Sequence, residues 1–196
     1  VIGGTTSNNT SHSVELTKEA TRVGVDAILA VVPYYNKPPQ DGLLLHFGAI
    51  AEATTLPVVL YNIPGRTNVN MLPATVHELA RRHPNIVAIK ESSGNAEQFT
   101  ALVRDRVRED FTVLSGDDYF YLPALALGAY GVISVAGHLC SHERRALGKA
   151  FDGGDVETAG RLHRDLQPLF TALFAHASPI PVKWAMNEYG FRAGAW

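Results

Sequence analysis

Residues 57–94, PVVLYNIPGRTNVNMLPATVHELARRHPNIVAIKESSG, carry the pattern that decides the fold. Two short runs, at 57–61 and 86–90, are rich in Val, Leu and Ile and barely alternate with polar residues. Such runs are typical of parallel strands that are buried on both faces. The segment between them, 74–82, has the amphipathic spacing of a helix, and Pro73 suits the first turn of that helix. The stretch therefore predicts a strand, a helix and a second, parallel strand.

The same alternation extends along most of the chain. Further strands are predicted over the apolar runs at 1–3, 28–32, 111–115 and 131–135. Further helices are predicted over the amphipathic segments at 13–23, 40–54, 95–108, 119–127 and 141–151. Strands that alternate with helices indicate a parallel sheet with crossover connections. The runs recur about every 20 to 30 residues, and this regularity favours a (β/α)8 TIM barrel over a doubly wound sheet.

The predicted barrel is incomplete. A (β/α)8 barrel has eight strands and usually about 250 residues, whereas this sequence has 196 residues. We expect a TIM barrel truncated to about six β/α units over residues 1–154. Residues 155–196 are predicted to begin a C-terminal helical extension of the same domain, with helices over 156–174 and 181–189. Since Val1 lies inside an apolar run, the sequence reads as a fragment.

The composition argues against several classes of protein. The 17 Lys and Arg residues against 19 Asp and Glu residues give a formal net charge of −2, so no basic field for nucleic acid is expected. No apolar run approaches the roughly 20 residues of a membrane span, and no signal peptide is readable. Cys140 is the only cysteine and cannot form an internal disulfide, which indicates a reducing compartment. We therefore expect a cytoplasmic protein that binds neither nucleic acid nor membranes.

Lys90 is the first candidate for a catalytic residue. It follows the apolar residues 86–89 at the carboxyl end of a predicted strand, where active sites lie in parallel βα folds. Loss of hydration at such a place lowers the pKa of a lysine and makes the neutral, nucleophilic amine accessible for Schiff-base chemistry. The alternative is that Lys90 pairs with Glu91 or extends its amine into solvent.

Tyr61 and Arg66 are candidates near the end of the preceding strand. A hydroxyl at Tyr61 would face Lys90 across neighbouring strands, and phenols act as proton shuttles in dry pockets. Arg66 lies four residues past Asn62, where a guanidinium can bind a substrate carboxylate with two parallel hydrogen bonds. Each residue also has an ordinary interpretation, a packed core tyrosine for Tyr61 and a solvated loop arginine for Arg66.

Other polar groups give weaker signals, and we expect no metal site. His138 and His142 would share a helical face, but no carboxylate completes an HExxH-type motif. Asp117 and Asp118 are possible paired acids, although capping of the following helix is the favoured interpretation.

Five ordered motifs carry a resemblance to a known family. They are PYYNKP at 33–38, LYNIPGRT at 60–67, IKESSG at 89–94, LSGDD at 114–118 and GVISV at 131–135. In order and spacing these motifs resemble the dihydrodipicolinate synthases, members of the pyruvate-dependent class I aldolase superfamily. The match extends from Val1 to about Ala185 and includes PIPVK at 179–183.

The resemblance implies condensation of pyruvate with aspartate semialdehyde, the entry step to diaminopimelate and lysine. Lys90 matches the family lysine that forms an imine with pyruvate, so no separate cofactor is expected. Tyr61 matches the tyrosine that shuttles protons at the imine-forming centre. Tyr35 matches a relay tyrosine donated by the neighbouring subunit, which implies a homo-oligomer, a dimer or a dimer of dimers.

The resemblance also assigns residues that bind substrates and a regulator. Arg66 matches the arginine that binds the carboxylate of the semialdehyde, and Gly116 and Ile133 match positions that line the pyruvate pocket. Asn8 and Tyr34 match two residues of the lysine-inhibition pocket of feedback-regulated members. His12 occupies the position of that pocket's glutamate, so strong feedback inhibition by lysine is not expected.

Two departures leave alternatives open. The first two β/α units of the family, with a Gly-Thr-Thr-Gly-Glu motif, have no counterpart here, and we expect the 196-residue chain by itself to be poorly soluble and inactive. A sister enzyme, an N-acetylneuraminate lyase or a keto-deoxy sugar acid aldolase, would keep the lysine and the tyrosine, but Arg66 favours the synthase. A non-catalytic barrel that serves as a scaffold is the third hypothesis.

Overall fold

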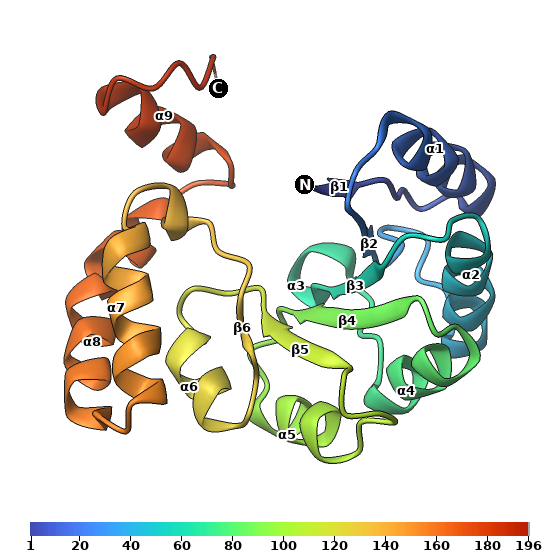
Figure 1. Ribbon diagram of the computed structural model, residues 1–196. Helices are drawn as coiled ribbons and strands as arrows, with labels where there is room; N and C mark the ends of the chain where they lie inside the picture. The colour runs from blue at the N-terminus through green and yellow to red at the C-terminus, as the bar shows by residue number, and fades with distance from the viewer. Residues whose placement is uncertain (196) are drawn as a thin grey trace. The chain divides into compact units, whose positions relative to one another are not determined.

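The computed structural model describes residues 1–195, and the contacts of the chain group it into two compact units. Unit 1 comprises Val1–Leu114 and Leu127–Tyr130, and unit 2 comprises Ser115–Ala126 and the described residues from Gly131 onward. Figure 1 labels the elements of both units. The predicted extension 155–196 ends at Trp196, which lies outside the described residues. The single domain expected from the sequence stays a prediction.

The strands confirm the α/β class. They are β1 (Ile2–Gly4), β2 (Ala27–Val31), β3 (Val58–Asn62), β4 (Ile86–Glu91), β5 (Thr112–Ser115) and β6 (Gly131–Val132). Hydrogen-bonded neighbours follow chain order from β1 to β6. The pairs β1–β2, β2–β3 and β3–β4 are parallel, as the nearly continuous apolar runs predict.

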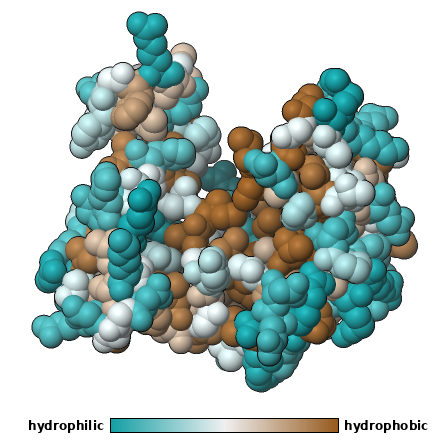
Figure 2. Space-filling model, in the orientation of Figure 1, coloured by the Kyte–Doolittle hydropathy of each residue, from teal (hydrophilic) through white to brown (hydrophobic). Residues whose placement is uncertain are grey.

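Helices connect the strands of unit 1. They are α1 (Thr10–Val23), α2 (Gln40–Glu52), α3 (Pro64–Thr67), α4 (Pro73–Arg82) and α5 (Ala96–Arg104). The side chain of Asn9 caps the start of α1 by accepting a hydrogen bond from the backbone nitrogen of His12. The helix is ended by Gly24, which has a left-handed backbone conformation with φ of 84°. As expected, α4 begins with Pro73. In Figure 2, hydrophilic residues cover much of the outer surface of α1 and α2.

The core of unit 1 lies between the sheet and these helices. It consists of large apolar side chains that are fully buried, among them Ile28, Leu43, Phe47, Ile50, Leu60, Leu79, Ile86, Ile89 and Phe99. These residues come from strands and from the inner faces of α2, α4 and α5. Removal of this apolar surface from water is the main force that holds the helices against the sheet.

Unit 2 is mainly helical. It contains α6 (Tyr121–Ala126), a 3₁₀ turn η1 (Ala136–His138), α7 (Ser141–Asp152), α8 (Val156–Leu173) and α9 (Ile180–Glu188). One apolar cluster gathers around the fully buried Phe170, and a second gathers around Leu147. The helices predicted at 141–151, 156–174 and 181–189 are confirmed within one or two residues.

The predicted ends of two elements are wrong because polar side chains bind groups far away in the chain. The strand predicted at 131–135 ends at Val132, because the backbone nitrogens of Val135 and Ala136 donate to the carboxylate of Asp118 instead of to a strand. The helix predicted at 95–108 ends at Arg104. Beyond that point, the guanidinium of Arg108 donates to carbonyl oxygens of Ala80, Pro84 and Ile86, which holds residue 108 away from a continued helix.

The elements do not support the weak metal hypothesis for His138 and His142. His138 belongs to η1 whereas His142 belongs to α7, so the two imidazoles do not share one helix as the weak metal hypothesis required.

Among the described residues, no helix is both long and apolar enough to cross a membrane.

Candidate active site

Lys90 and Tyr61 lie side by side at the carboxyl ends of β4 and β3. The parallel register pairs Tyr61 with Lys90, so the two side chains leave the same face of neighbouring strands. The Nζ atom of Lys90 lies over the aromatic ring of Tyr61, 3.8 Å from the ring centroid. Both residues are half-buried. The predicted pairing of these residues on adjacent strands is confirmed, and the amine lies against the face of the ring. That the Tyr61 hydroxyl faces the amine stays a prediction.

Arg66 lies on the short helix α3, directly after β3, and its side chain is exposed. No pattern in the sequence predicted this helix. The helix ends at Thr67, whose hydroxyl oxygen lies 3.1 and 3.0 Å from the carbonyl oxygens of Ile63 and Val69 and shares its one proton between them. Asn68 follows in a left-handed conformation with φ of 62°. The loop that carries Arg66 is therefore a defined turn, and the guanidinium is available to a ligand.

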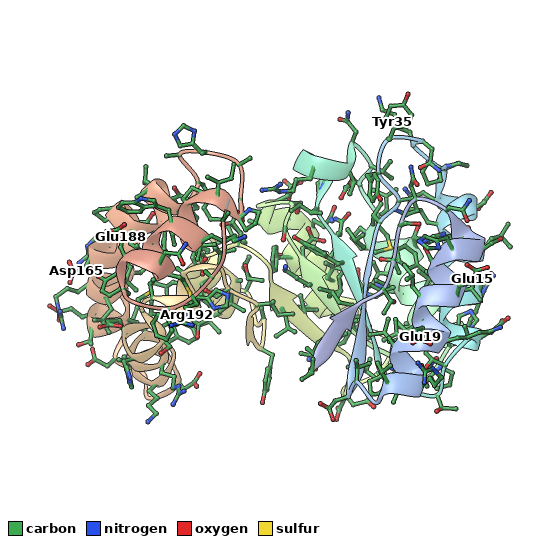
Figure 3. The ribbon with its side chains drawn as sticks, turned by 90° about the horizontal axis from the view of Figure 1, so that it is seen from above. Glu15, Glu19, Tyr35, Asp165, Glu188 and Arg192 are labelled. Atoms are coloured by element: carbon green, nitrogen blue, oxygen red, sulfur yellow. The ribbon has the colours of Figure 1, made fainter. Side chains whose placement is uncertain are left out.

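Tyr35 lies at the tip of a strained turn after β2. Its φ is 75°, and the backbone nitrogen of Asn36 donates to the carbonyl oxygen of Tyr34 at 2.9 Å, which closes a three-residue turn. A tyrosine at positive φ is rare, and such strain is concentrated at functional sites. The residue is 88% exposed, and Figure 3 shows it at the outer margin of unit 1. This turn presents the phenol outward.

Two of the three residues assigned to the regulatory pocket lie together. The side-chain nitrogen of Asn8 donates to the carbonyl oxygen of Tyr34 at 3.2 Å, and the side chain of Asn36 donates back to the carbonyl oxygen of Asn8 at 3.0 Å. His12 lies on the first turn of α1 with its side chain exposed, and its Nδ1 is 3.6 Å from Oε2 of Glu15. A role of these residues in lysine binding stays a prediction.

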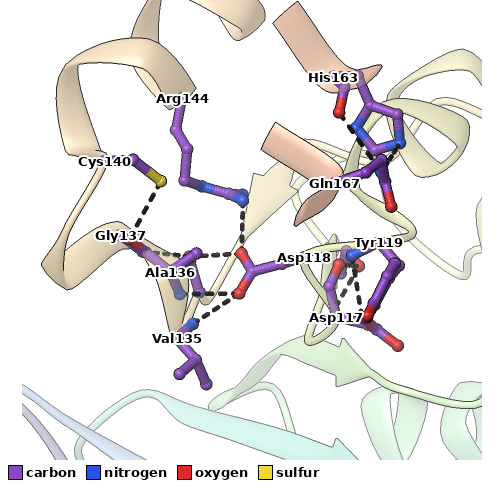
Figure 4. Close-up of polar contacts among 12 residues, drawn as sticks. Asp117, Asp118, Tyr119, Val135, Ala136, Gly137, Cys140, Arg144, His163 and Gln167 are labelled. Carbon is purple, nitrogen blue, oxygen red and sulfur yellow. Dashed lines mark hydrogen bonds and ion pairs between the residues drawn. The ribbon is translucent and has the colours of Figure 1, made fainter. Parts of the chain in front are cut away.

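Gly116 and Ile133 belong to unit 2 and flank a buried charge cluster. Gly116 follows β5, and the backbone nitrogen of Ile133, just past β6, donates to the carbonyl oxygen of Ser115 at 2.8 Å. Nearby, the carboxylate of Asp118 forms an ion pair with Arg144 and accepts a hydrogen bond from the backbone nitrogen of Ala136 at 2.8 Å (Figure 4). Asp118 is 1% exposed and Arg144 6% exposed.

The expectation that Asp117 and Asp118 cap the next helix is wrong for Asp118. Its carboxylate accepts hydrogen bonds from Arg144 and from the backbone nitrogen of Ala136 in the loop after β6. Oδ1 of Asp117 accepts from the backbone nitrogen of Tyr119, two residues before α6 begins. Burial, and secondarily the charge of Asp118, raise the pKa of Asp117. The two acids therefore have separate partners.

Asn62 and Glu91 are two buried polar residues that the sequence analysis did not single out. Both have no exposed surface, and they are paired across β3 and β4 one position beyond Tyr61 and Lys90. The side-chain nitrogen of Asn62 lies 3.0 Å from Oε2 of Glu91. The sequence held a signal for this pair, because a polar residue directly follows both Tyr61 and Lys90. Since side chains alternate between faces along a strand, these two residues are expected on the opposite face of the sheet.

The sequence profile of the dihydrodipicolinate synthetase family matches residues 1–196. A curated relative, the 4-hydroxy-tetrahydrodipicolinate synthase of Desulforamulus reducens, is 50% identical over 194 residues. That alignment covers 99% of this chain and 65% of the relative, so the chain spans slightly less than two thirds of the relative's length.

Solved structures of high similarity agree with this match. A dihydrodipicolinate synthase from Cyanidioschyzon merolae with lysine bound is 49% identical and superposes with a TM-score of 0.96 over 99% of this chain and 65% of that one. A chloride-inhibited dihydrodipicolinate synthase from Acinetobacter baumannii, complexed with pyruvate, is 42% identical, with a TM-score of 0.90 over 96% of this chain and 64% of that one. The chain belongs to the dihydrodipicolinate synthetase family.

Proposed function

We propose that this chain forms the part of a 4-hydroxy-tetrahydrodipicolinate synthase that carries its Schiff-base lysine. The protein would condense pyruvate with L-aspartate 4-semialdehyde, and Lys90 would be the residue that binds pyruvate covalently. The name of the 50% identical relative and the pyruvate in the Acinetobacter baumannii structure support the choice of reaction and substrate. The six strands would be the third to eighth of a (β/α)8 barrel, and the protein would act in the cytoplasm.

The observation that carries the proposal is the position of the Lys90 amine over the ring of Tyr61, 3.8 Å from the centroid. An amine nucleophile needs a neighbouring group that moves protons, because imine formation expels the carbonyl oxygen as water. The aromatic face also provides an environment that stabilises a cation, such as the protonated imine. A lysine and a tyrosine at paired positions on adjacent strands meet both needs.

The reaction follows from this pair of side chains. The neutral amine of Lys90 attacks the keto carbon of pyruvate, and loss of water leaves an imine. The imine accepts the electron pair released when a methyl proton leaves, which gives an enamine. The enamine carbon attacks the aldehyde, and the phenol of Tyr61 moves protons to and from the reacting oxygen and nitrogen atoms. Cyclisation through the amine of the condensed product then displaces Lys90.

The remaining roles complete the proposal. Arg66, exposed on α3, binds the carboxylate of the semialdehyde, and Tyr35, exposed on its turn, relays protons in the site of a neighbouring copy. The assignment of Gly116 and Ile133 to the pyruvate pocket stays a prediction. The active form is a homo-oligomer, and the reaction needs no metal or separate cofactor. The 196-residue chain by itself stays predicted to be inactive.

Trapping of the imine tests the proposal. The protein expressed from its complete reading frame is incubated with pyruvate and borohydride, and the product is analysed by intact mass and by peptide mapping. We expect a mass increase equal to pyruvic acid minus one oxygen atom, located on the peptide that contains Lys90. The matched control is Lys18→Ala on α1, an exposed lysine whose removal leaves the adduct unchanged, whereas Lys90→Ala abolishes it.

Three outcomes of this experiment separate the hypotheses. An adduct on Lys90 together with a cyclic product from aspartate semialdehyde supports the synthase. An adduct without that product favours a sister aldolase that splits or forms sugar acids. Absence of any adduct in a folded protein leaves only a non-catalytic scaffold.

A further inference from the structure

Behind the Lys90–Tyr61 pair, a buried polar network occupies the opposite face of the same two strands. Side chains alternate between faces along a strand, so Asn62 and Glu91 point away from Tyr61 and Lys90. Both are completely buried. A carboxylate buried among apolar residues has a large desolvation cost unless several donors surround it, so its presence here needs an explanation.

The donors around Glu91 come from three segments of the chain. Oε1 accepts from the backbone nitrogen of Ser93 at 2.6 Å, and Oε2 accepts from the side-chain nitrogens of Asn62 at 3.0 Å and Gln98 at 2.9 Å. Gln98 lies on α5. The carboxylate therefore joins the end of β3, the turn after β4 and the first turns of α5.

The orientation of each side-chain amide follows from this carboxylate. A carboxylate only accepts hydrogen bonds, so Asn62 turns its nitrogen toward Glu91 and its oxygen toward the backbone nitrogen of Met71, 3.0 Å away. Asn70 continues the network, since its side chain accepts from Asn62 at 2.8 Å and donates to Gln98 at 2.8 Å. One acceptor thus orders several amides.

The ladder between β3 and β4 is irregular at one end and regular at the other. Val58 pairs with Ile86 but Val59 pairs with Ala88, so the β3–β4 ladder contains an irregularity near its beginning. A shift of one residue would turn every following side chain to the other face. The hydrogen bonds between Asn62 and Glu91 hold the register at the opposite end, beside the proposed catalytic residues.

We propose that Glu91 is a positioning residue, which keeps Lys90 and Tyr61 side by side by locking the ends of β3 and β4 through Asn62 and Gln98. The inference rests on the proposed function, because it assigns a purpose to the placement of the Schiff-base lysine. Glu91 does not touch the substrate. It acts through the strand ends, and its removal lowers the rate of imine formation more than the affinity for pyruvate.

The test compares Glu91→Gln with Asn85→Ala in the protein expressed from its complete reading frame. Glu91→Gln replaces one carboxylate oxygen by an NH2 group, which cannot accept the hydrogen bonds donated to that oxygen. Asn85→Ala is the control, and it removes side-chain hydrogen bonds to the carbonyl oxygens of Ala51 and Thr54 just before β4 begins. The rate of imine formation is measured by borohydride quenching at several pyruvate concentrations. This rate is divided by the number of active sites that form the reduced adduct when the reaction has gone to completion.

We expect Glu91→Gln to lower the maximal rate per site by about 10- to 100-fold, with the pyruvate concentration for half-maximal rate changed by less than about threefold. Asn85→Ala should lower the thermal midpoint but keep the rate per site within about twofold. Gln98→Leu, which removes one donor and keeps the carboxylate, should give an intermediate rate. It serves as the second variant should Glu91→Gln fail to fold.

The possible results separate the inference from the proposed function. Wild-type rates per site in Glu91→Gln, or in Gln98→Leu if Glu91→Gln does not fold, overturn the positioning role while Lys90 still forms an adduct. A raised half-maximal concentration with an unchanged maximal rate also overturns it, because that result indicates a binding role. Absence of an adduct in the folded wild-type protein overturns the proposed function and the inference together.

Discussion

His46 lies on α2 with 4% of its surface exposed, and desolvation lowers its pKa to about 4. Its Nδ1 lies 2.9 Å from the hydroxyl oxygen of Thr10 on α1, and its ring packs edge-on against Phe47. Among the described residues, the other ring nitrogen is buried without a hydrogen-bond partner, so a second proton would find no acceptor there. The folded state therefore favours the neutral imidazole.

Stability should consequently depend on pH through His46. Its pKa is lower in the folded chain than in the unfolded chain, so the stabilising contribution is complete above about pH 6.5 and is lost as the pH falls toward about 4. The free energy of unfolding is measured by urea denaturation at about pH 7.5 and at about pH 5. Between these pH values we expect it to fall by about 1–2 kcal/mol more in the wild type than in His46→Phe.

The exposed His12 on α1 provides the control for this measurement. A His12→Phe variant, which changes an exposed imidazole and leaves His46 in place, should keep the pH dependence that His46 produces. Equal pH dependence in wild type and His46→Phe would show that the buried imidazole does not govern acid stability.

At the scale of elements, the ion pair between Asp118 and Arg144 joins the segment after β5 to α7 within unit 2 (Figure 4). The carboxylate also accepts from the backbone nitrogens of Val135 and Ala136, and the guanidinium lies over the ring of Tyr121, 4.6 Å from its centroid. One buried acid thereby ends β6 early and determines where η1 begins. The loops after β5 and β6, which carry Gly116 and Ile133, are held by this contact.

Removal of one partner should be costly because it leaves the other charge buried. Arg144→Leu is expected to lower the free energy of unfolding by about 3 kcal/mol, whereas Arg145→Leu, at the exposed neighbouring position, should change it by less than about 0.5 kcal/mol. Denaturant unfolding of both variants provides the measurement. Similar losses in the two variants would mean that the pair contributes no more than an ordinary surface charge.

At the scale of the whole molecule, the role proposed for Tyr35 predicts that a second copy completes the active site. Its turn is pinned to the segment after β1 by hydrogen bonds between Asn8, Tyr34 and Asn36, yet the phenol is 88% exposed. Backbone strain is concentrated at functional sites, so the proposed contact with another copy would explain this turn.

Mixing of two inactive variants tests this arrangement. Both variants are made in the protein expressed from its complete reading frame. Lys90→Ala lacks the nucleophile and Tyr35→Phe lacks the relay hydroxyl, so each alone should be nearly inactive. In a mixed dimer, the copy with an intact Lys90 receives an intact Tyr35 from its partner, and co-refolding should restore about a quarter of wild-type activity. Mixtures no more active than the separate variants would place Tyr35 in its own copy's site or outside the site.

Much of this molecule follows from local sequence patterns. The apolar runs at 57–61 and 86–90 predict buried parallel strands, since only strands covered on both faces tolerate such continuous apolar character. Adjacent strands then bring Tyr61 and Lys90 together, because chain neighbours usually pair. Pro73 and Gly24 mark helix ends through their restricted and permissive backbones, respectively. These features depend on residues close in the chain.

Other features were decided by contacts between distant residues. The early end of β6, the end of α5 and the network around Glu91 all depend on a polar side chain reaching groups far away in the chain, as Asp118 reaches Ala136 and Arg108 reaches Ala80. By itself, the sequence determined the class of fold and the strand ends where chemistry is expected. Only the tertiary structure decided which buried polar groups satisfy one another, because hydrogen-bond partners are selected by distance in space and not by separation along the chain.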